Sequence, residues 1–274
     1  MRNLDETNPK EMRPSRFVGV CAGLPFVLGA ISLPLAYGAA PEVPLLKNPV
    51  AQVLFAVLVI SLFLAVTSLV LRWDWKVKYY GVSLIFGASI SLFAVVPLLV
   101  LMIYGSAPLW LKSVVLFFYV LSHALWCRKF FILYGDAFNN TALRKIIYEE
   151  DAEAVYYLRR GDQFLLDRYY KFSQMPRDRY FVVFIVLALG LMPMMDSVRT
   201  YTGIPFTHVF LLVGMLPVSW MSFGFAVRGY LVFYLYPTKI KMATGKEVYV
   251  DVVGGPPPLD KNFLRARRVK KIKR

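Results

Sequence analysis

The sequence predicts an all-α polytopic membrane protein. It would have six transmembrane helices, a cytoplasmic helical hairpin and a short cytoplasmic β-hairpin with a basic tail. Three observations support this fold class. Hydrophobic residues make up 58% of the 274 residues, whereas soluble domains contain about 45–50%. These residues form blocks close to the roughly 20 residues that cross a bilayer as a helix. The segments between the blocks alternate between few and many basic residues.

Each apolar block is expected to form one helix, because the backbone of a lipid-embedded segment must satisfy its own hydrogen bonds. The fourth block can continue as helix to residue 134, and the fifth is the shortest, with Pro193 near its end. The expected spans cover residues 17–38, 50–71, 79–104, 109–126, 180–195 and 208–236.

The basic residues orient these spans. Lys and Arg number four before the first block, three after the second, ten between residues 128 and 179, and eleven after the sixth. Each remaining loop has one. Basic loops stay in the cytoplasm, so the protein is expected in the cytoplasmic (inner) membrane with both termini on its cytoplasmic side. The chain then divides into a cytoplasmic segment (1–16), helices 1–4 (17–127), a cytoplasmic hairpin (128–179), helices 5–6 (180–236) and a cytoplasmic tail (237–274).

The cytoplasmic segment 128–179 is expected to form a helical hairpin. Asn139 or Asn140 can cap a helix that begins near Thr141. Gly161 would end that helix, and Asp162 would cap the next one. The apolar side of the hairpin either packs on the spans and headgroups or forms a docking face for a cytosolic partner.

The tail is expected to begin with a β-hairpin, residues 239–242 and 246–253 around a turn at 243–245. An isolated hairpin is marginal in water, so it would pair with the helical hairpin, another subunit or another chain. The anionic inner leaflet of the bilayer is the favoured partner of the last residues, ahead of an acidic protein. We expect no nucleic-acid binding, since no recognition fold is visible. The candidate lipid- or partner-binding residues are Arg265, Arg267, Arg268, Lys270, Lys271, Lys273 and Arg274.

Three polar residues within or beside the spans are candidate intramembrane sites: Arg228, His123 and Arg128. Arg228 either snorkels to the inner headgroups or forms a buried pair with Asp74 or with a carbonyl freed by a proline. His123 is more simply a hydrogen-bonded packing residue than a ligand. Arg128 occupies a similar inner boundary after the fourth span.

No catalytic residue, cofactor site or metal site is expected. The hydrolase, zinc-protease, P-loop and dinucleotide patterns are missing. An intramembrane enzyme would need an acid–base pair, and the spans offer none. Clustering of Asp74, Arg128, His123 and Arg228 at the inner leaflet would favour an enzyme. The cysteines, Cys21 and Cys127, are read as small apolar residues.

We therefore expect a non-enzymatic structural or assembly subunit of a multi-protein envelope complex, such as a secretion or conjugation apparatus. Its partners would be other membrane or cytosolic proteins, with a homo-oligomer as a further possibility. A membrane immunity or accessory protein fits similarly. A transporter or channel for an apolar or lipid-like substrate is the other alternative, and a water-lined cavity at Pro193 and Pro217 would favour it.

Overall fold

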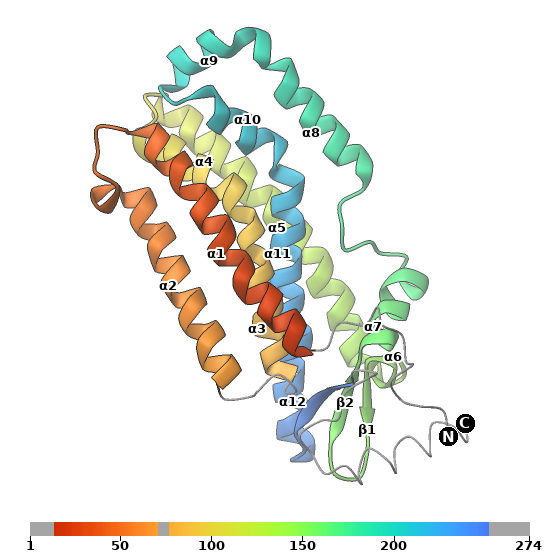
Figure 1. Ribbon diagram of the computed structural model, residues 1–274. Helices are drawn as coiled ribbons and strands as arrows, with labels where there is room; N and C mark the ends of the chain where they lie inside the picture. Colours follow the sequence, from red (N-terminus) through yellow and green to blue (C-terminus); the bar gives the residue numbers. More distant parts are fainter. Residues whose placement is uncertain (1–13, 71–76, 252–274) are drawn as a thin grey trace, which may run out of the picture.

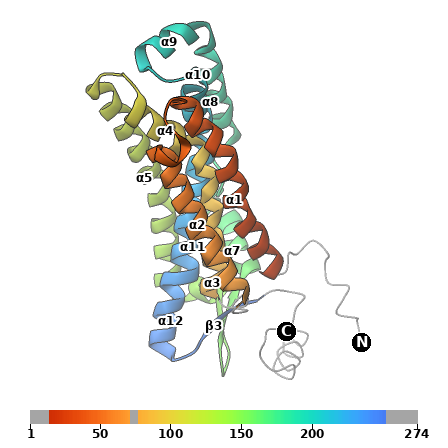
Figure 2. The ribbon, with the colours of Figure 1, turned by 60° about the vertical axis from the view of Figure 1, so that its left-hand side comes forward.

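Long helices run side by side, with a small sheet at one end, in the computed structural model of the protein (Figures 1 and 2). It describes residues 14–70 and 77–251. The sheet end holds β1, β2, β3, α6, α7 and α12, and the opposite end holds α9. The molecule is therefore an elongated bundle with two chemically different ends.

The described residues before Leu109 form four α-helices. The side chain of Asn48 fixes the first turnaround, since its Nδ2 donates to the Ala36 carbonyl (2.9 Å) and its Oδ1 accepts from the Val50 amide (3.0 Å). This capping contact starts the second helix and ties it to the first. The elements are α1 (Pro14–Ala39), a 3₁₀ turn (Leu45–Lys47), α2 (Pro49–Val70), α3 (Val77–Gly87), a 3₁₀ turn (Ala88–Ser91) and α4 (Leu92–Tyr104).

From Leu109 to Asp251, the described chain contains its longest helix and its three strands. Two π-helical turns interrupt its helices, one after α7 and one between α11 and α12. The elements are α5 (Leu109–Asn139), α6 (Thr141–Ile147), β1 (Tyr148–Glu150), β2 (Val155–Leu158), α7 (Arg159–Phe164), a π turn (Leu165–Tyr169), α8 (Asp178–Gly190), a 3₁₀ turn (Met192–Met194), α9 (Met195–Thr202), α10 (Phe206–Gly214), α11 (Leu216–Tyr230), a π turn (Leu231–Leu235), α12 (Tyr236–Thr244) and β3 (Val248–Asp251).

Three helical stretches in the described parts of the chain are long and apolar enough to cross a membrane, so the expectation of six is not supported. They are Leu109–Asn139, Asp178–Thr202 and Leu216–Thr244. The other apolar stretches, Phe26–Ala39, Pro49–Ile60 and Ala88–Tyr104, are shorter.

Local geometry accounts for part of this difference. A 3₁₀ turn at Ala88–Ser91 divides the expected third span, and the expected sixth span breaks at Met215, ahead of Pro217. Proline cannot continue a helix that precedes it, because its ring displaces the i−4 carbonyl. The expected fifth span is longer than predicted, because helix resumes after the turn at Met192–Met194 and continues to Thr202.

The three strands form one sheet in the order β1-β2-β3. β1 and β2 are antiparallel, β2 and β3 are parallel, and Tyr157 pairs with both Tyr148 and Val250. The expected helical hairpin is therefore only partly correct: α6 and α7 exist, but a β-hairpin joins them. Its residues are mostly aromatic or β-branched, types that favour strands.

The expected β-hairpin of the tail is wrong in its first arm. Residues 236–244 form α12, and Gly245 ends that helix in the left-handed region at φ 70°, donating its amide to the Lys241 carbonyl. A glycine after a run without strong strand signals serves as a helix C-cap as readily as a hairpin turn. The second arm is β3, and it pairs with the 128–179 segment, one of the three partners expected for it.

Two cores fill the bundle. The core at the sheet end includes Phe130, Tyr134, Tyr157, Leu165 and Phe233. A second core joins α1, α2, α4 and α10 nearer the opposite end. We call residues 141–169 and 236–251, which surround the first core with the ends of α5 and α11, the sheet unit.

The outer surfaces of α5 and α8 are apolar. Phe117 and Phe118 on α5, and Val182, Val183 and Val186 on α8, are all exposed. Figure 1 shows α8 at the outside of the bundle. Apolar surfaces of this extent on helices of spanning length are expected where lipid takes the place of water.

Candidate functional site at the end of the membrane helices

A buried ion pair joins the last turns of α11 to α7. Nη2 of Arg228 lies 2.7 Å from Oδ2 of Asp162, whose side chain is not exposed at all, and the Arg228 side chain is 14% exposed. Desolvating two charges costs several kcal/mol each. Such a pair persists only where further hydrogen bonds satisfy both groups.

Two buried tyrosines supply those bonds to the carboxylate. The Tyr134 hydroxyl donates to Oδ1 of Asp162 at 3.0 Å, and the Tyr157 hydroxyl donates to Oδ2 at 2.5 Å. Nη2 of Arg228 also lies 3.4 Å from the Tyr157 hydroxyl oxygen. The carboxylate thus accepts from three donors that belong to α5, β2 and α11, which binds the sheet unit to two membrane helices.

The other side of the Arg228 guanidinium binds the linker of residues 170–177, which leads to α8. Nη1 of Arg228 donates to Oε1 of Gln174 at 2.6 Å. Nε of Arg228 is buried and has no hydrogen-bond partner among the described residues. We call Arg228, Asp162, Tyr134, Tyr157 and Gln174 the Arg228 network.

The linker is held at its start as well. The Tyr170 hydroxyl donates to the Asp136 carboxylate on α5, and the Phe172 amide donates to the Leu166 carbonyl at 2.8 Å. Between them Lys171 has φ 48°, the one non-glycine residue with positive φ in the described chain. That conformation costs an L-residue roughly 1–2 kcal/mol, so the neighbouring contacts impose it.

Burial raises the pKa of Tyr157, because a phenolate there would lose its hydration, and the negative charge of Asp162 raises it further. The pKa of Tyr148 is raised for the same two reasons. Tyr148 donates its hydroxyl to the Val232 carbonyl in the π turn. Both hydroxyls therefore remain donors at neutral pH and hold the sheet against the end of α11.

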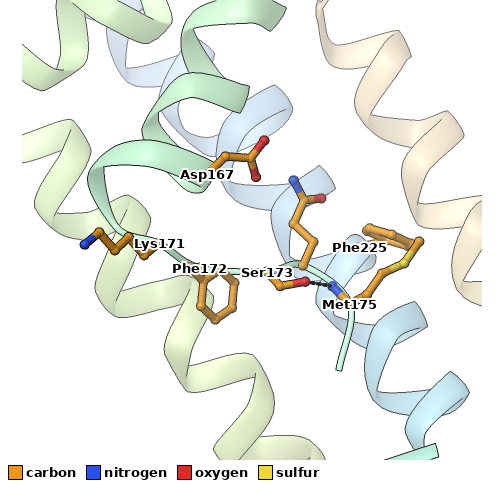
Figure 3. A pocket seen from close by; sticks show the side chains of 7 residues that line it. Asp167, Lys171, Phe172, Ser173, Met175 and Phe225 are labelled. Carbon is orange, nitrogen blue, oxygen red and sulfur yellow. Dashed lines mark hydrogen bonds between the residues drawn. The ribbon is translucent and has the colours of Figure 1, made fainter. Parts of the chain in front are cut away.

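An open pocket of about 420 Å³ lies beside the network (Figure 3). Phe172 forms part of its wall and is itself fixed by ring contacts with Trp126 and Phe130, with centroids at 6.1 and 5.1 Å. The residues that line the pocket are Asp167, Lys171, Phe172, Ser173, Gln174, Met175 and Phe225. Apolar and polar side chains thus meet in one concave site.

The predicted polar residues do not gather in one place. Arg228 is paired, but with Asp162, and Asp74 lies outside the described residues. Arg128 is exposed on α5. The basic residues from Arg265 to Arg274 also lie outside the described residues.

His123 belongs to a separate polar group between α5 and α11. Its Nδ1 donates to the Tyr119 carbonyl at 2.7 Å, and its Nε2 lies 2.8 Å from Oγ of Ser219. Tyr119 also bonds Ser219 through its hydroxyl at 2.8 Å. Both ring nitrogens are occupied, as in a hydrogen-bonded packing residue.

Sequence reasoning missed Asp162 as the partner of Arg228. A signal was present: Leu158, Asp162 and Leu165 follow the spacing of one helix face, so Asp162 is a charge on an otherwise apolar stripe. Gln174 carried no such signal, since it lies in a linker without periodicity.

The two prolines of the transporter alternative lie in different surroundings. Pro193 is exposed in the turn before α9, while Pro217 is buried at the start of α11. Neither lines the pocket described above.

Within residues 14–70 and 77–251, no group of three or more His, Cys, Asp or Glu side chains is arranged to hold a metal ion. Comparisons of the chain with protein-family models, curated proteins and solved structures find no match.

Proposed function

We propose that this protein is a non-enzymatic structural or assembly subunit of a multi-protein complex in the cytoplasmic membrane. Its sheet unit would serve as a docking platform for other proteins. The observation that carries the proposal is the Arg228 network, which fixes the sheet unit to the ends of the membrane helices through the buried carboxylate of Asp162.

A docking platform benefits from such a network. Buried hydrogen-bonded charges have strict geometry, and the four hydrogen bonds that join Asp162 and Arg228 to Tyr134, Tyr157 and Gln174 favour one relative orientation of the elements that carry them. The sheet unit is also continuous with α11 through the π turn at Leu231–Leu235. A surface held in one orientation loses little conformational entropy when a partner binds.

The charge distribution favours a cytoplasmic location for the sheet unit. Lys145, Arg159 and Lys246 belong to this unit, whereas Lys47 and Arg199 lie in the turns and helix of the opposite end. Basic residues concentrate on the cytoplasmic side of membrane proteins.

The exposed surface of the sheet unit carries both signs of charge. Lys145 and Arg159 are exposed together with Glu150 and Glu153. Mixed charge suits a protein partner better than a nucleic acid, which requires a continuous basic surface.

The test is purification of the tagged protein from native membranes in mild detergent, followed by identification of co-purifying proteins. We expect a stoichiometric set of envelope proteins. The triple variant Lys145→Glu/Glu153→Lys/Arg159→Glu should lose this set, because it reverses exposed charges without touching the core. The control Lys47→Glu, at the opposite end, should retain it. A lone protein, or loss in the control as well, contradicts the proposal.

Orientation is tested with single cysteines in a variant that lacks Cys21 and Cys127. Leu46→Cys and Ala152→Cys place thiols at exposed positions at the two ends. A membrane-impermeant maleimide should label Leu46→Cys in intact cells and Ala152→Cys only after permeabilisation. The reverse pattern would place the sheet unit outside the cell and rule out a cytoplasmic platform.

A further inference from the structure

The pocket beside the Arg228 network lies where a membrane helix begins. Its linker residues, 171–175, lead directly to α8 at Asp178. Nearby cations lie over aromatic rings: Lys129 over Trp126 at 4.8 Å and Arg179 over Tyr180 at 5.2 Å. Aromatic and basic residues of this kind mark the boundary between hydrocarbon and headgroups. The pocket is therefore at headgroup level.

Its lining is amphipathic. Phe172, Met175 and Phe225 provide apolar surface, and Met175 is 58% exposed. Asp167 and Lys171 are exposed, and neither forms an ion pair or hydrogen bond within the described chain. Figure 3 shows their charged ends pointing away from one another. One free carboxylate and one free ammonium group therefore border the same pocket.

The Arg228 network fixes the orientation of the Gln174 side-chain amide, the third polar group at the pocket. A guanidinium can only donate, so Gln174 must present its Oε1 to Arg228, as it does at 2.6 Å. The amide nitrogen of Gln174 is then left with two N–H donors. Ser173 accepts from the Met175 amide at 3.2 Å, so its hydroxyl proton also remains available. Ser173 and Gln174 thus offer a phosphate up to three N–H and O–H donors, and Lys171 adds a cation at the edge of the pocket.

We propose that this pocket binds the headgroup of a zwitterionic phospholipid with a primary ammonium group, of which phosphatidylethanolamine is the simplest. Lys171, Ser173 and Gln174 donate to the phosphate, and Asp167 accepts from the ammonium group. Phe225 and Met175 contact the start of the acyl chains. A volume of about 420 Å³ is within the usual range of ligand sites. This site does not depend on the docking function proposed above.

The experiment uses the purified, delipidated full chain in detergent and measures lipid binding by native mass spectrometry. The probes are phosphatidylethanolamine, phosphatidylcholine and phosphatidylglycerol with identical acyl chains. We expect phosphatidylethanolamine to bind about tenfold more tightly, the equivalent of one charge-assisted hydrogen bond. Phosphatidylcholine has no N–H donor for Asp167, and phosphatidylglycerol has no cation.

Two pocket variants and two matched controls locate the site. Asp167→Asn should abolish the preference for phosphatidylethanolamine over phosphatidylglycerol, and Lys171→Gln should weaken all three lipids. Lys145→Gln and Glu153→Gln, exposed at the same end but outside the pocket, should change nothing. All four side chains are exposed, so the thermal midpoints without lipid should match that of the wild type and exclude a folding defect.

Equal affinity for the three lipids, or unchanged binding in both pocket variants, overturns the proposal. A final arm separates the lipid from its free headgroup. Soluble glycerophosphoethanolamine should bind at least tenfold more weakly than the lipid, since it lacks acyl chains for Phe225 and Met175. Equal affinity would identify a soluble phosphate ester as the ligand and rule out the lipid.

Discussion

Removing the positive charge of Arg228 should destabilise the protein far more than an ordinary ion-pair loss. In Arg228→Met, the Asp162 carboxylate stays buried with two tyrosine donors and no cation. Losing one partner of a buried pair costs roughly 3–5 kcal/mol. For a chain of this size, each kcal/mol lowers the melting temperature by about 2–4 °C, so we expect a decrease of roughly 6–20 °C.

The comparison is with an ion pair of similar length on the surface. Lys246 lies 2.7 Å from Glu150, with side chains 26% and 56% exposed. Such pairs contribute about 0–1 kcal/mol. Lys246→Ala should therefore lower the melting temperature by no more than roughly 4 °C.

A double-mutant cycle separates the ion pair from general packing effects. Asp162→Asn keeps the size of the side chain and removes its charge, so the double variant Arg228→Met/Asp162→Asn no longer contains a lone buried charge. It should be more stable than the sum of the single effects predicts, by about 0.5–3 kcal/mol. The measurement is unfolding in detergent, followed by circular dichroism. A coupling energy near zero, with Arg228→Met no worse than Lys246→Ala, would falsify the reasoning.

Three further predictions concern packing, capping and pH. Gly81→Ala should destabilise by about 1–3 kcal/mol in the same unfolding assay, because a Cβ there would lie 2.4 Å from Cβ of Phe233; Gly135→Ala, with nothing within 4 Å, should be neutral or slightly stabilising. Asn140→Ala should cost about 1 kcal/mol, because the Asn140 side chain accepts from the first amides of α6; unchanged stability would mean that the cap contributes nothing. Because the pKa of Tyr157 is raised in the folded state, its protonated hydroxyl contributes fully to the free energy of unfolding below a pH of about 10. This contribution is lost as the pH rises toward the folded-state pKa. Above pH 10 the unfolding free energy of Tyr157→Phe should fall less steeply, by about 1.4 kcal/mol per pH unit, and an identical slope in variant and wild type would contradict this.

The sequence by itself determined features that depend on neighbouring residues. Asn140, one of the two residues expected as the cap, caps α6, because its side chain reaches amides only two and three residues away. The expected spans 109–126, 180–195 and 208–236 overlap the three stretches that are long and apolar enough to cross a membrane, since length and hydrophobicity are properties of a continuous segment. Local signals were weaker where one residue type occurs in two structures, as glycine does at Gly245, which could end a helix or form a hairpin turn.

The tertiary structure alone decided which distant segments meet. β3 joins a sheet whose neighbouring strand lies about ninety residues earlier, with Val155 opposite Val248, so its pairing partner is not a local property of the sequence. Asp162 and Arg228 are 66 residues apart; only the tertiary structure brings the side chain of Asp162 to Tyr134 on α5 and Arg228 on α11, away from water. Gln174 acquires its role in the same way, since its amide orientation depends on a guanidinium that packing brings to it. A local pattern can mark Asp162 as a buried charge, but only the long-range packing supplies the cation and the hydroxyl groups that offset its desolvation.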